Sequence, residues 1–432
     1  MRDTLEVLAN FYEQVRPLTG EILSDFRARS YAMFLQKGLP SRKSENWRYA
    51  ITANWFKENL KQPEIITEKD LRAVIAEKFP AALDSDIIIY NGQVLLNRQN
   101  KNITVSSLRD AISSNPKQVE MALQDMQQNN VTSNPFVDLN LASFTDGFFI
   151  DIPENKNNLP KISITYVNTD SFFLNLLNIV NVGSRAGIHL VENYIGEDSA
   201  AYNLNSVSVI RLACSASLAA EQLLKDSNLA LCQNFRHVSM AKESSFTQRN
   251  YKFAGGTSRE ETVIDLQEEH ATCNYEGIDF STSKNWHATH VKVLHNADNC
   301  TSKQNFRSLV ANTSQCSFLG HIYVPKGVKN TVAYQDSKSL LLGETARSNV
   351  KPYLEIFTDD VVCTHSATVG ELDKKSLFYL RSRGLTEPQA YILLLNSFVN
   401  EIIMASNCER IKAESLECVH NLSKAIFLEG DL

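Results

Sequence analysis

The spacing of apolar residues changes twice along the chain and divides it into three regions. In residues 1–140, apolar side chains recur every three or four positions, which is the period of an amphipathic helix. These positions are Leu5, Leu8, Tyr12 and Val15, and farther on Leu71, Val74 and Ile75. Thr67 stands before the second set as a helix N-cap would, with Asp70 three residues later. The pattern predicts a mainly helical N-terminal region.

Two features interrupt this helical pattern. In residues 87–96, IIIYNGQVLL, two apolar runs flank Asn91-Gly92, a dipeptide that favours the two-residue turn of a β-hairpin. The tryptophans Trp47 and Trp55 lie close together in the sequence. We interpret them as anchors of helix packing, with a partner-binding surface as the alternative.

From residue 141 to residue 371 the helical period is lost. Short runs rich in β-branched and aromatic residues, such as ISITYV and HVKVLH, alternate with polar corners at spacings of about 10 to 18 residues. Ile162, Ile164 and Tyr166 alternate with polar residues and would share one face of a strand. An amide-rich stretch at 127–134 predicts the linker into this region.

So many short strands must protect their edges, which a sandwich, a barrel or a parallel β-helix can each do. Asn-Gly, the strongest hairpin signal, does not recur after Gly92. The corners carry Asn, Ser, Thr and Asp instead. Both observations favour a parallel β-helix core over residues 141–371, although the pattern alone leaves the other two architectures open.

Residues 372–432 return to helical spacing. Gly384 follows Arg381 and Arg383, a combination typical of a helix C-terminus. Pro388 suits the first turn of the next helix. We expect this C-terminal helical domain to cover the end of the β-helix, where strand edges and core would otherwise be exposed.

The bulk composition excludes several classes of protein. The 432-residue chain has a net charge of −6, which argues against binding to nucleic acids or anionic membranes. It has no run of the roughly 18 apolar residues that a membrane helix needs. Its start shows no basic, apolar leader, so we expect a cytoplasmic protein. The eight cysteines form no CxxC pair, unlike those of a disulfide scaffold, a zinc ribbon or a resident four-cysteine cluster.

Common catalytic motifs are missing from the sequence. There is no GxxxxGK[ST] phosphate loop, no GxGxxG after a strand and no GxSxG elbow, so we expect a non-catalytic protein that does not hydrolyse ATP alone. We interpret Gly255-Gly256 as a turn. Four acidic residues are interpreted as a solvated face rather than a glycosidase pair: Glu260, Glu261, Glu268 and Glu269.

The densest group of reactive side chains lies in LEIFTDDVVCTHSATVG, residues 354–370. If Val361 to His365 is extended, Cys363 and His365 lie on one face of a strand. A thiol beside an imidazole can bind a soft or borderline metal ion, or hold a sulfur species. The alternative is a packed cysteine beside a surface histidine.

A second group contains His287 and His290 in the pattern HxxH, followed by His295 and Cys300. A metal pair at this spacing requires a helix. The segment predicts a strand, in which His287 and His290 point to opposite faces. We therefore interpret these histidines as structural and hydrogen-bonded.

Residues 351–385, KPYLEIFTDDVVCTHSATVGELDKKSLFYLRSRGL, resemble the SufB/SufD family of iron–sulfur cluster assembly proteins. Looser agreement occurs upstream, at residues 41–49, 139–153, 255–266 and 305–310. No cysteine precedes Cys214, and this feature, with the DDVxCxH form of the motif, resembles the SufD branch. The chain departs from the family pattern at Asp298, Ser308, Thr358 and Ser366.

The resemblance implies a right-handed parallel β-helix between N-terminal and C-terminal helical regions. It implies a scaffold in the SUF system that works with a SufB subunit and the ATPase SufC. By resemblance, His365 lies at the SufB–SufD junction, and Cys363 is a lesser candidate there; both would touch iron or a nascent cluster transiently. SufC is expected to dock on Leu377, Phe378, Tyr379, Leu380, Arg381, Ser382, Arg383, Gly384 and Leu385.

Other interpretations stay open at this point. The resemblance implies no permanently bound cofactor, and it leaves open a reduced flavin in the assembled complex and a homodimer of the isolated chain. A β-helical carbohydrate-active enzyme is the alternative from another class, because such folds often host polysaccharide lyases. A purely structural interaction module, with Cys363 and His365 inert, is the third hypothesis.

Overall fold

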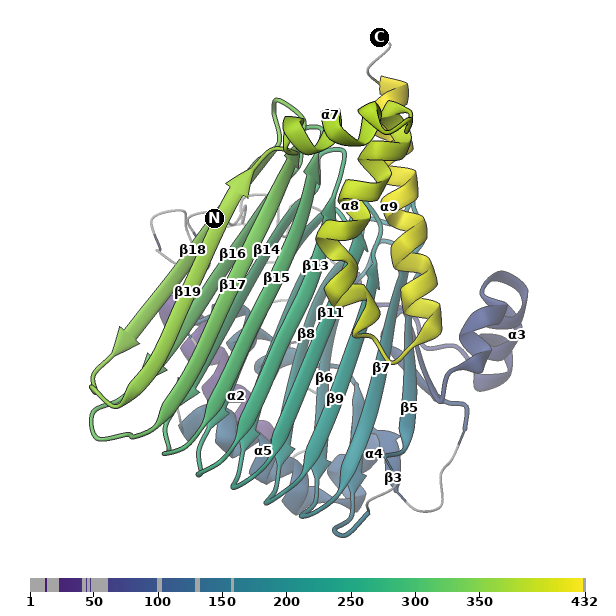
Figure 1. The fold of residues 1–432 in the computed structure, drawn as a ribbon. Coiled ribbons are helices and arrows are strands. Elements are labelled where there is room, and N and C mark those ends of the chain that lie inside the picture. The colour runs from purple at the N-terminus through teal and green to yellow at the C-terminus, as the bar shows by residue number, and fades with distance from the viewer. Residues whose placement is uncertain are drawn as a thin grey trace.

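The chain forms a long parallel β-solenoid of about eight turns with helices on its flanks (Figure 1). The computed structural model describes residues 12–13, 23–40, 44, 47, 61–98, 103–128, 133–156 and 159–429. The predicted helical positions Leu5, Leu8 and Val15 lie outside the described residues, and so does Trp55. Tyr12 lies in a short described piece of helix.

Successive strands of the solenoid alternate between two sheets, so each turn adds one strand to each sheet. In spatial order, the described strands of the ten-stranded sheet are β19 (Val361–Gly370), β17 (Thr331–Leu342), β15 (Thr301–Ala311), β13 (Thr272–Ser281), β11 (Ser245–Ala254), β9 (Ser217–Lys225), β7 (Gly187–Gly196), β5 (Lys161–Asn168), β1 (Ile87–Tyr90) and β2 (Gln93–Leu96). Those of the nine-stranded sheet are β18 (Arg347–Ile356), β16 (Gln315–Val324), β14 (Trp286–His295), β12 (Thr257–Leu266), β10 (Leu231–Met240), β8 (Asn203–Leu212), β6 (Phe173–Val182), β4 (Phe148–Ile152) and β3 (Thr104–Ser107). The predicted parallel β-helix is confirmed.

The solenoid is held together by alternation within strands and by stacked turns between them. Ile162, Ile164 and Tyr166 of β5 share the inward face and join the core between the sheets, as predicted. Turns stack through backbone bonds, for example from the N–H of Ser215 to the carbonyl of Lys242 at 2.8 Å. One residue in each of many turns has φ between 54° and 62°: Arg185, Ser215, Glu243, His270, Ser283, Asn299, Asn312 and Asn330. Asparagine tolerates the left-handed region better than most residues, so the asparagine corners suit these turns.

The N-terminal helices cover the outer face of the nine-stranded sheet. They are α2 (Ser24–Lys37), α4 (Leu108–Ser114), α5 (Pro116–Gln128) and α6 (Pro135–Ser143). Their side chains, among them Phe26 and Leu123, share a core with Val207, Phe235 and Val263 of the sheet. Because this buries the outward apolar residues of β8, β10 and β12, the helices and the sheet form one packed unit.

A second group at the N-terminal end contains α3 (Glu68–Lys78), the short 3-10 helix η4 (Pro80–Asp84) and the hairpin β1–β2. The side chain of Thr67 accepts a hydrogen bond from the N–H of Asp70 at 3.2 Å, so the predicted cap is confirmed. The predicted hairpin is also confirmed, with φ of 45° at Asn91 and 83° at Gly92.

The C-terminal helices are α7 (Lys374–Ser382), α8 (Glu387–Met404) and α9 (Glu409–Glu429). Helices α8 and α9 lie across the outer face of the ten-stranded sheet rather than over the end of the solenoid (Figure 1). The expectation of a helical cap at that end is therefore wrong. Leu395, Val399 and Ile402 pack against outward apolar residues such as Leu223 and Tyr251, which need cover along the flank. None of the described helices is long and apolar enough to cross a membrane.

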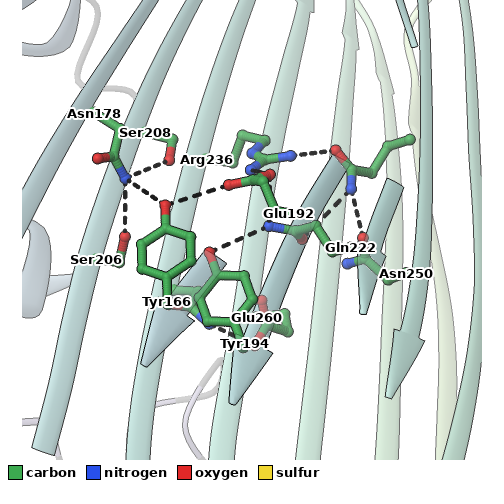
Figure 2. Close-up of polar contacts among 12 residues, drawn as sticks. Tyr166, Asn178, Glu192, Tyr194, Ser206, Ser208, Gln222, Arg236, Asn250 and Glu260 are labelled. Carbon is green, nitrogen blue, oxygen red and sulfur yellow. Dashed lines mark hydrogen bonds and ion pairs between the residues drawn. The ribbon is translucent and has the colours of Figure 1, made fainter. Parts of the chain in front are cut away.

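The space between the two sheets contains a polar network as well as apolar side chains (Figure 2). Glu192 of β7 is fully buried and accepts hydrogen bonds from Arg236 at 2.6 Å and from Gln222 at 3.0 Å. Tyr166 and Asn178 extend the network toward β6 and β8. Each buried charge thus has an opposite charge or hydrogen-bond partner, as burial requires.

The interpretation of the four glutamates as one solvated face is wrong for two of them. Glu268 and Glu269 are exposed, but Glu260 and Glu261 are 5% and 6% exposed. Glu260 accepts a hydrogen bond from Asn234 at 3.0 Å between the sheets. Glu261 pairs with Arg259 at 2.9 Å on the outer side. Their partners stabilise the buried carboxylates.

Candidate functional site

The last turn of the solenoid is formed by β18 and β19, and each of these strands has a neighbour on only one side among the described residues. Strand β19 pairs with β17 in parallel, with Cys363 opposite Ala333 and His365 opposite Gln335. We call the unpaired edges of β18 and β19 the open end. An unpaired edge of this length presents free backbone donors and acceptors to another chain.

Cys363 and His365 lie on the same face of β19, as the alternation predicts. Cys363 is half-buried and packs against a small apolar cluster that includes Ala333 and Ile322. His365 is exposed, because no further turn among the described residues covers the inward face at this position. Both side chains therefore point toward the space between the sheets at the open end, and the imidazole is accessible from outside.

Burial raises the pKa of the Cys363 thiol above its ordinary value, although a backbone hydrogen bond from Ala333 opposes the shift. The thiol is therefore protonated at neutral pH and is a weak nucleophile until a metal ion or a cationic neighbour approaches. Asp359 and Asp360, the two carboxylates upstream, are exposed in the turn that leads into β19. The local chemistry favours a site that gains ligands when another surface arrives.

The described residues contain no group of three or more His, Cys, Asp or Glu side chains that could hold a metal ion. Cys363 and His365 supply two ligands at most, whereas iron and zinc sites in proteins usually have four. The open end can therefore contribute part of a coordination sphere, and the remaining ligands would come from sulfide or another chain.

Helix α7 follows β19 after only three residues and presents its side chains to solvent. Asp373 caps the helix by accepting bonds from the N–H groups of Lys375 and Ser376 at 3.2 and 3.0 Å. No residue of α7 is buried, and Phe378 and Tyr379 are 74% and 55% exposed. The remaining residues of the predicted docking segment lie on the same helix or just after it: Leu377, Leu380, Arg381, Ser382, Arg383, Gly384 and Leu385. Exposed aromatic side chains on a solvent-facing helix are typical of a protein-binding surface.

The second histidine group lies away from the open end. His287 and His290 point to opposite faces of strand β14, as predicted. His287 lies between the sheets with Nδ1 2.7 Å from Asp279 Oδ1, and Cys316 donates to the other oxygen of that carboxylate at 3.4 Å. This buried group was missed in the sequence because its members lie on three different strands. His290 is on the outer side next to Glu261, so both histidines are buried parts of the framework.

Similarity to known proteins covers nearly the whole chain. Residues 166–398 match the family model described as SUF system FeS cluster assembly, SufBD core domain, and residues 5–163 match the SufBD protein N-terminal region. An iron–sulfur cluster assembly SufBD family protein of Synechocystis is 26% identical over 88% of this chain and 87% of its own length. The iron–sulfur cluster assembly protein SufD of Escherichia coli is 25% identical over 88% of this chain and 89% of its own. A SufBD family protein of Staphylococcus aureus is 22% identical over 91% and 83%.

The core match ends within α8 and includes β18, β19 and α7, so the open end and the exposed helix both lie inside the region that defines the family. The motif at residues 351–385, from which the sequence already indicated this relationship, falls in the same interval. Fold, motif and two adjoining family matches agree. The chain therefore belongs to the SufBD family of iron–sulfur cluster assembly proteins.

Proposed function

We propose that this protein is the SufD-like subunit of a cluster assembly complex and that a SufB-like subunit binds at its open end. The observation that carries the proposal is the exposed imidazole of His365 on the last strand, whose outer edge has no neighbour among the described strands. Pairing of strand edges would extend both sheets into the partner. It would also place His365 and Cys363 in the seam between the two chains.

A site of this kind suits a scaffold that must release its product. His365 and Cys363 are too few to hold iron or a cluster alone, and the raised pKa of the thiol weakens its binding further. Ligands from the SufB-like subunit would complete the coordination sphere while the cluster forms. Iron and sulfide are the cargo of this site, and the chain itself acts without catalysis of its own.

Energy for the assembly would come from a SufC-like ATPase that docks on α7. The support is the exposure of Phe378 and Tyr379 and the absence of a phosphate loop from the sequence. Arg383 lies 5.2 Å from the ring of Tyr379, which adds a cationic rim to the aromatic surface. A docked ATPase would thus sit three residues from the end of β19.

The test is anaerobic cluster formation with iron and sulfide in the reconstituted complex of this chain with SufB-like and SufC-like subunits. His365→Ala should leave the fold intact, since the side chain is exposed, and should lower the cluster yield at least tenfold if it supplies a ligand. His270→Asn is the matched control, because His270 is exposed in a remote turn with φ of 62° that asparagine tolerates. An unchanged yield with His365→Ala would remove His365 from the site and favour a purely structural role.

A further inference from the structure

Three polar side chains on the outer face of the ten-stranded sheet connect helix α8 to the strand that carries His365. They come from three successive turns: Arg307 of β15, Asp336 of β17 and Ser366 of β19. The guanidinium of Arg307 lies 5.9 Å from the ring centroid of Phe398 on α8. Its Nη2 donates to Asp336 Oδ2 at 2.8 Å, and Ser366 lies in register beside Asp336 on the same face of the sheet.

Arg307, the first residue of this series of contacts, is held firmly in place. The Arg307 side chain is only 8% exposed, and its Nη1 donates to the carbonyl of Phe306 at 2.9 Å. A guanidinium held by several bonds in one plane loses little freedom when it also binds a carboxylate. Arg307 therefore occupies one orientation between α8 and the sheet.

The second link stays charged. Burial raises the pKa of Asp336, but Arg307, Ser366 and Lys338 together outweigh it, so the pKa lies below its ordinary value. The carboxylate is thus ionised at neutral pH and accepts a charge-assisted hydrogen bond from Arg307. The Asp336 carboxylate thus lies between the Arg307 guanidinium, which is buried under α8, and the Ser366 residue of the exposed last strand.

The third link lies directly beside the candidate site. Ser366 is in register with Asp336, while the preceding residue, His365, is in register with Gln335. Successive side chains of a strand point to opposite faces but share one backbone. A contact that fixes Ser366 on the outer face therefore also fixes how far His365 projects on the inner face.

We propose that Arg307 and Asp336 are positioning residues. They couple the position of α8 on the sheet to the position of strand β19, and in this way they set the position of His365. The route runs from α8 through Phe398, Arg307, Asp336 and Ser366, in parallel with the covalent link from β19 to α7. Only its consequence for cluster assembly rests on the proposed function. A movement of α7 would reach β19 through the covalent link at the C-terminus of the strand. A movement of α8 would reach it through Ser366, in the middle of the strand.

Hydrogen exchange of the full-length protein, read in peptides covering residues 361–370, tests the route. Asp336→Asn and Ser366→Ala should each speed exchange in this strand by roughly three- to tenfold, because each removes the polar contact between the two strands on this face. Exchange in β11 should not change. The double variant should be no faster than the quicker single variant, because both remove the same interaction. Unchanged exchange in all three variants would overturn the proposal.

The contribution of α8 is tested by Phe398→Leu, which keeps an apolar side chain and removes the aromatic face beneath Arg307. It should speed exchange in residues 361–370 in the wild-type background and have no added effect in Asp336→Asn. The matched control is Lys303→Gln, since Lys303 also pairs with α8, at 4.0 Å from Glu401, but its side chain has no hydrogen bond or ion pair to β17 among the described residues. Equal effects of Phe398→Leu and Lys303→Gln on β19 would contradict a specific route through Arg307.

Cluster formation in the reconstituted complex separates this inference from the proposed function. If Asp336→Asn loosens β19 and lowers the cluster yield, both stand. If it loosens β19 and the yield is unchanged, the route stands and His365 loses its assigned role. If exchange in β19 is unchanged, the route fails whatever the yield.

Discussion

The two ends of the solenoid are built differently. At the N-terminal end, the outermost described strands β2 and β3 are four residues long and run antiparallel to their neighbours. At the C-terminal end, β18 and β19 are ten residues long, and both continue the parallel pattern of the body (Figure 1). Short edge strands discourage further pairing, whereas long regular ones invite it. The comparison indicates that one end terminates the fold, whereas the other leaves long strand edges open to the partner proposed above.

The largest effect is expected where the space between the sheets is compared with the exposed helix α7 that follows the open end. Glu192→Ala removes the buried counter-charge of Arg236 and should lower the free energy of unfolding by about 3–5 kcal/mol. Arg381→Ala breaks an ion pair with Glu387 in which both side chains are about half exposed, and should cost less than about 1 kcal/mol. Chemical denaturation of both variants measures the difference. Equal losses of unfolding free energy in the two variants would mean that the buried network stabilises the fold no more than an exposed ion pair does.

Acid should lower the free energy of unfolding, because several histidines of the solenoid are buried. Burial lowers the pKa of His237, His290 and His295 to about 4. Because these folded-state values lie below the unfolded value of about 6.5, the stability that neutral histidines provide is complete above pH 6.5 and is lost as the pH falls toward 4. Each histidine should remove on the order of 3 kcal/mol over this window.

His237 offers a clean test of this pH dependence. Neither ring nitrogen has a hydrogen-bond partner among the described residues, and the neighbours of His237 in register are Val209 and Val263. His237→Leu should therefore be as stable as the wild type at pH 7 and more stable at pH 4, measured by denaturation across the range. A parallel decline of the two proteins with pH would contradict the neutral, buried state of this side chain.

A smaller effect should separate the two ends directly. Gly92 in the β1–β2 turn has φ of 83°, and an added Cβ would lie 3.4 Å from Leu174. Gly92→Ala should therefore destabilise the hairpin by about 1–2 kcal/mol, seen as faster hydrogen exchange in residues 87–96. Gly370, the last residue of β19, has no described atom within 4 Å of an added Cβ, and Gly370→Ala should change exchange in β19 little. The opposite order of effects would mean that the open end is the more tightly packed of the two.

Much of the local structure could be predicted from the sequence. The period of two in β5 and β19 placed Ile162 and Ile164 on one face and Cys363 beside His365, because alternation follows from strand geometry alone. Asn91-Gly92 identified its hairpin because few dipeptides tolerate two positive φ values. These predictions needed no knowledge of distant residues.

Contacts between turns could not be predicted in the same way. Residues paired across turns are 26 to 32 positions apart, so no constant period connects Leu223 with Tyr251, or Asp336 with Ser366. Because of this variation, the sequence did not reveal that outward apolar residues line up across the ten-stranded sheet, where α8 and α9 cover them. The helices were therefore expected at the end of the solenoid instead. It also hid the partners of Glu260 and Glu261, and both were expected in solvent for that reason.

The measurement that tests the seam at the open end most directly is the alkylation rate of Cys363 with and without a SufB-like subunit. Exposed Cys214, in a turn far along the solenoid, serves as the internal control. Binding at the open end predicts that Cys363 reacts in the free chain and is protected in the complex, while the rate at Cys214 stays the same. Equal rates at Cys363 in the free and bound chain would place the partner elsewhere and contradict the account.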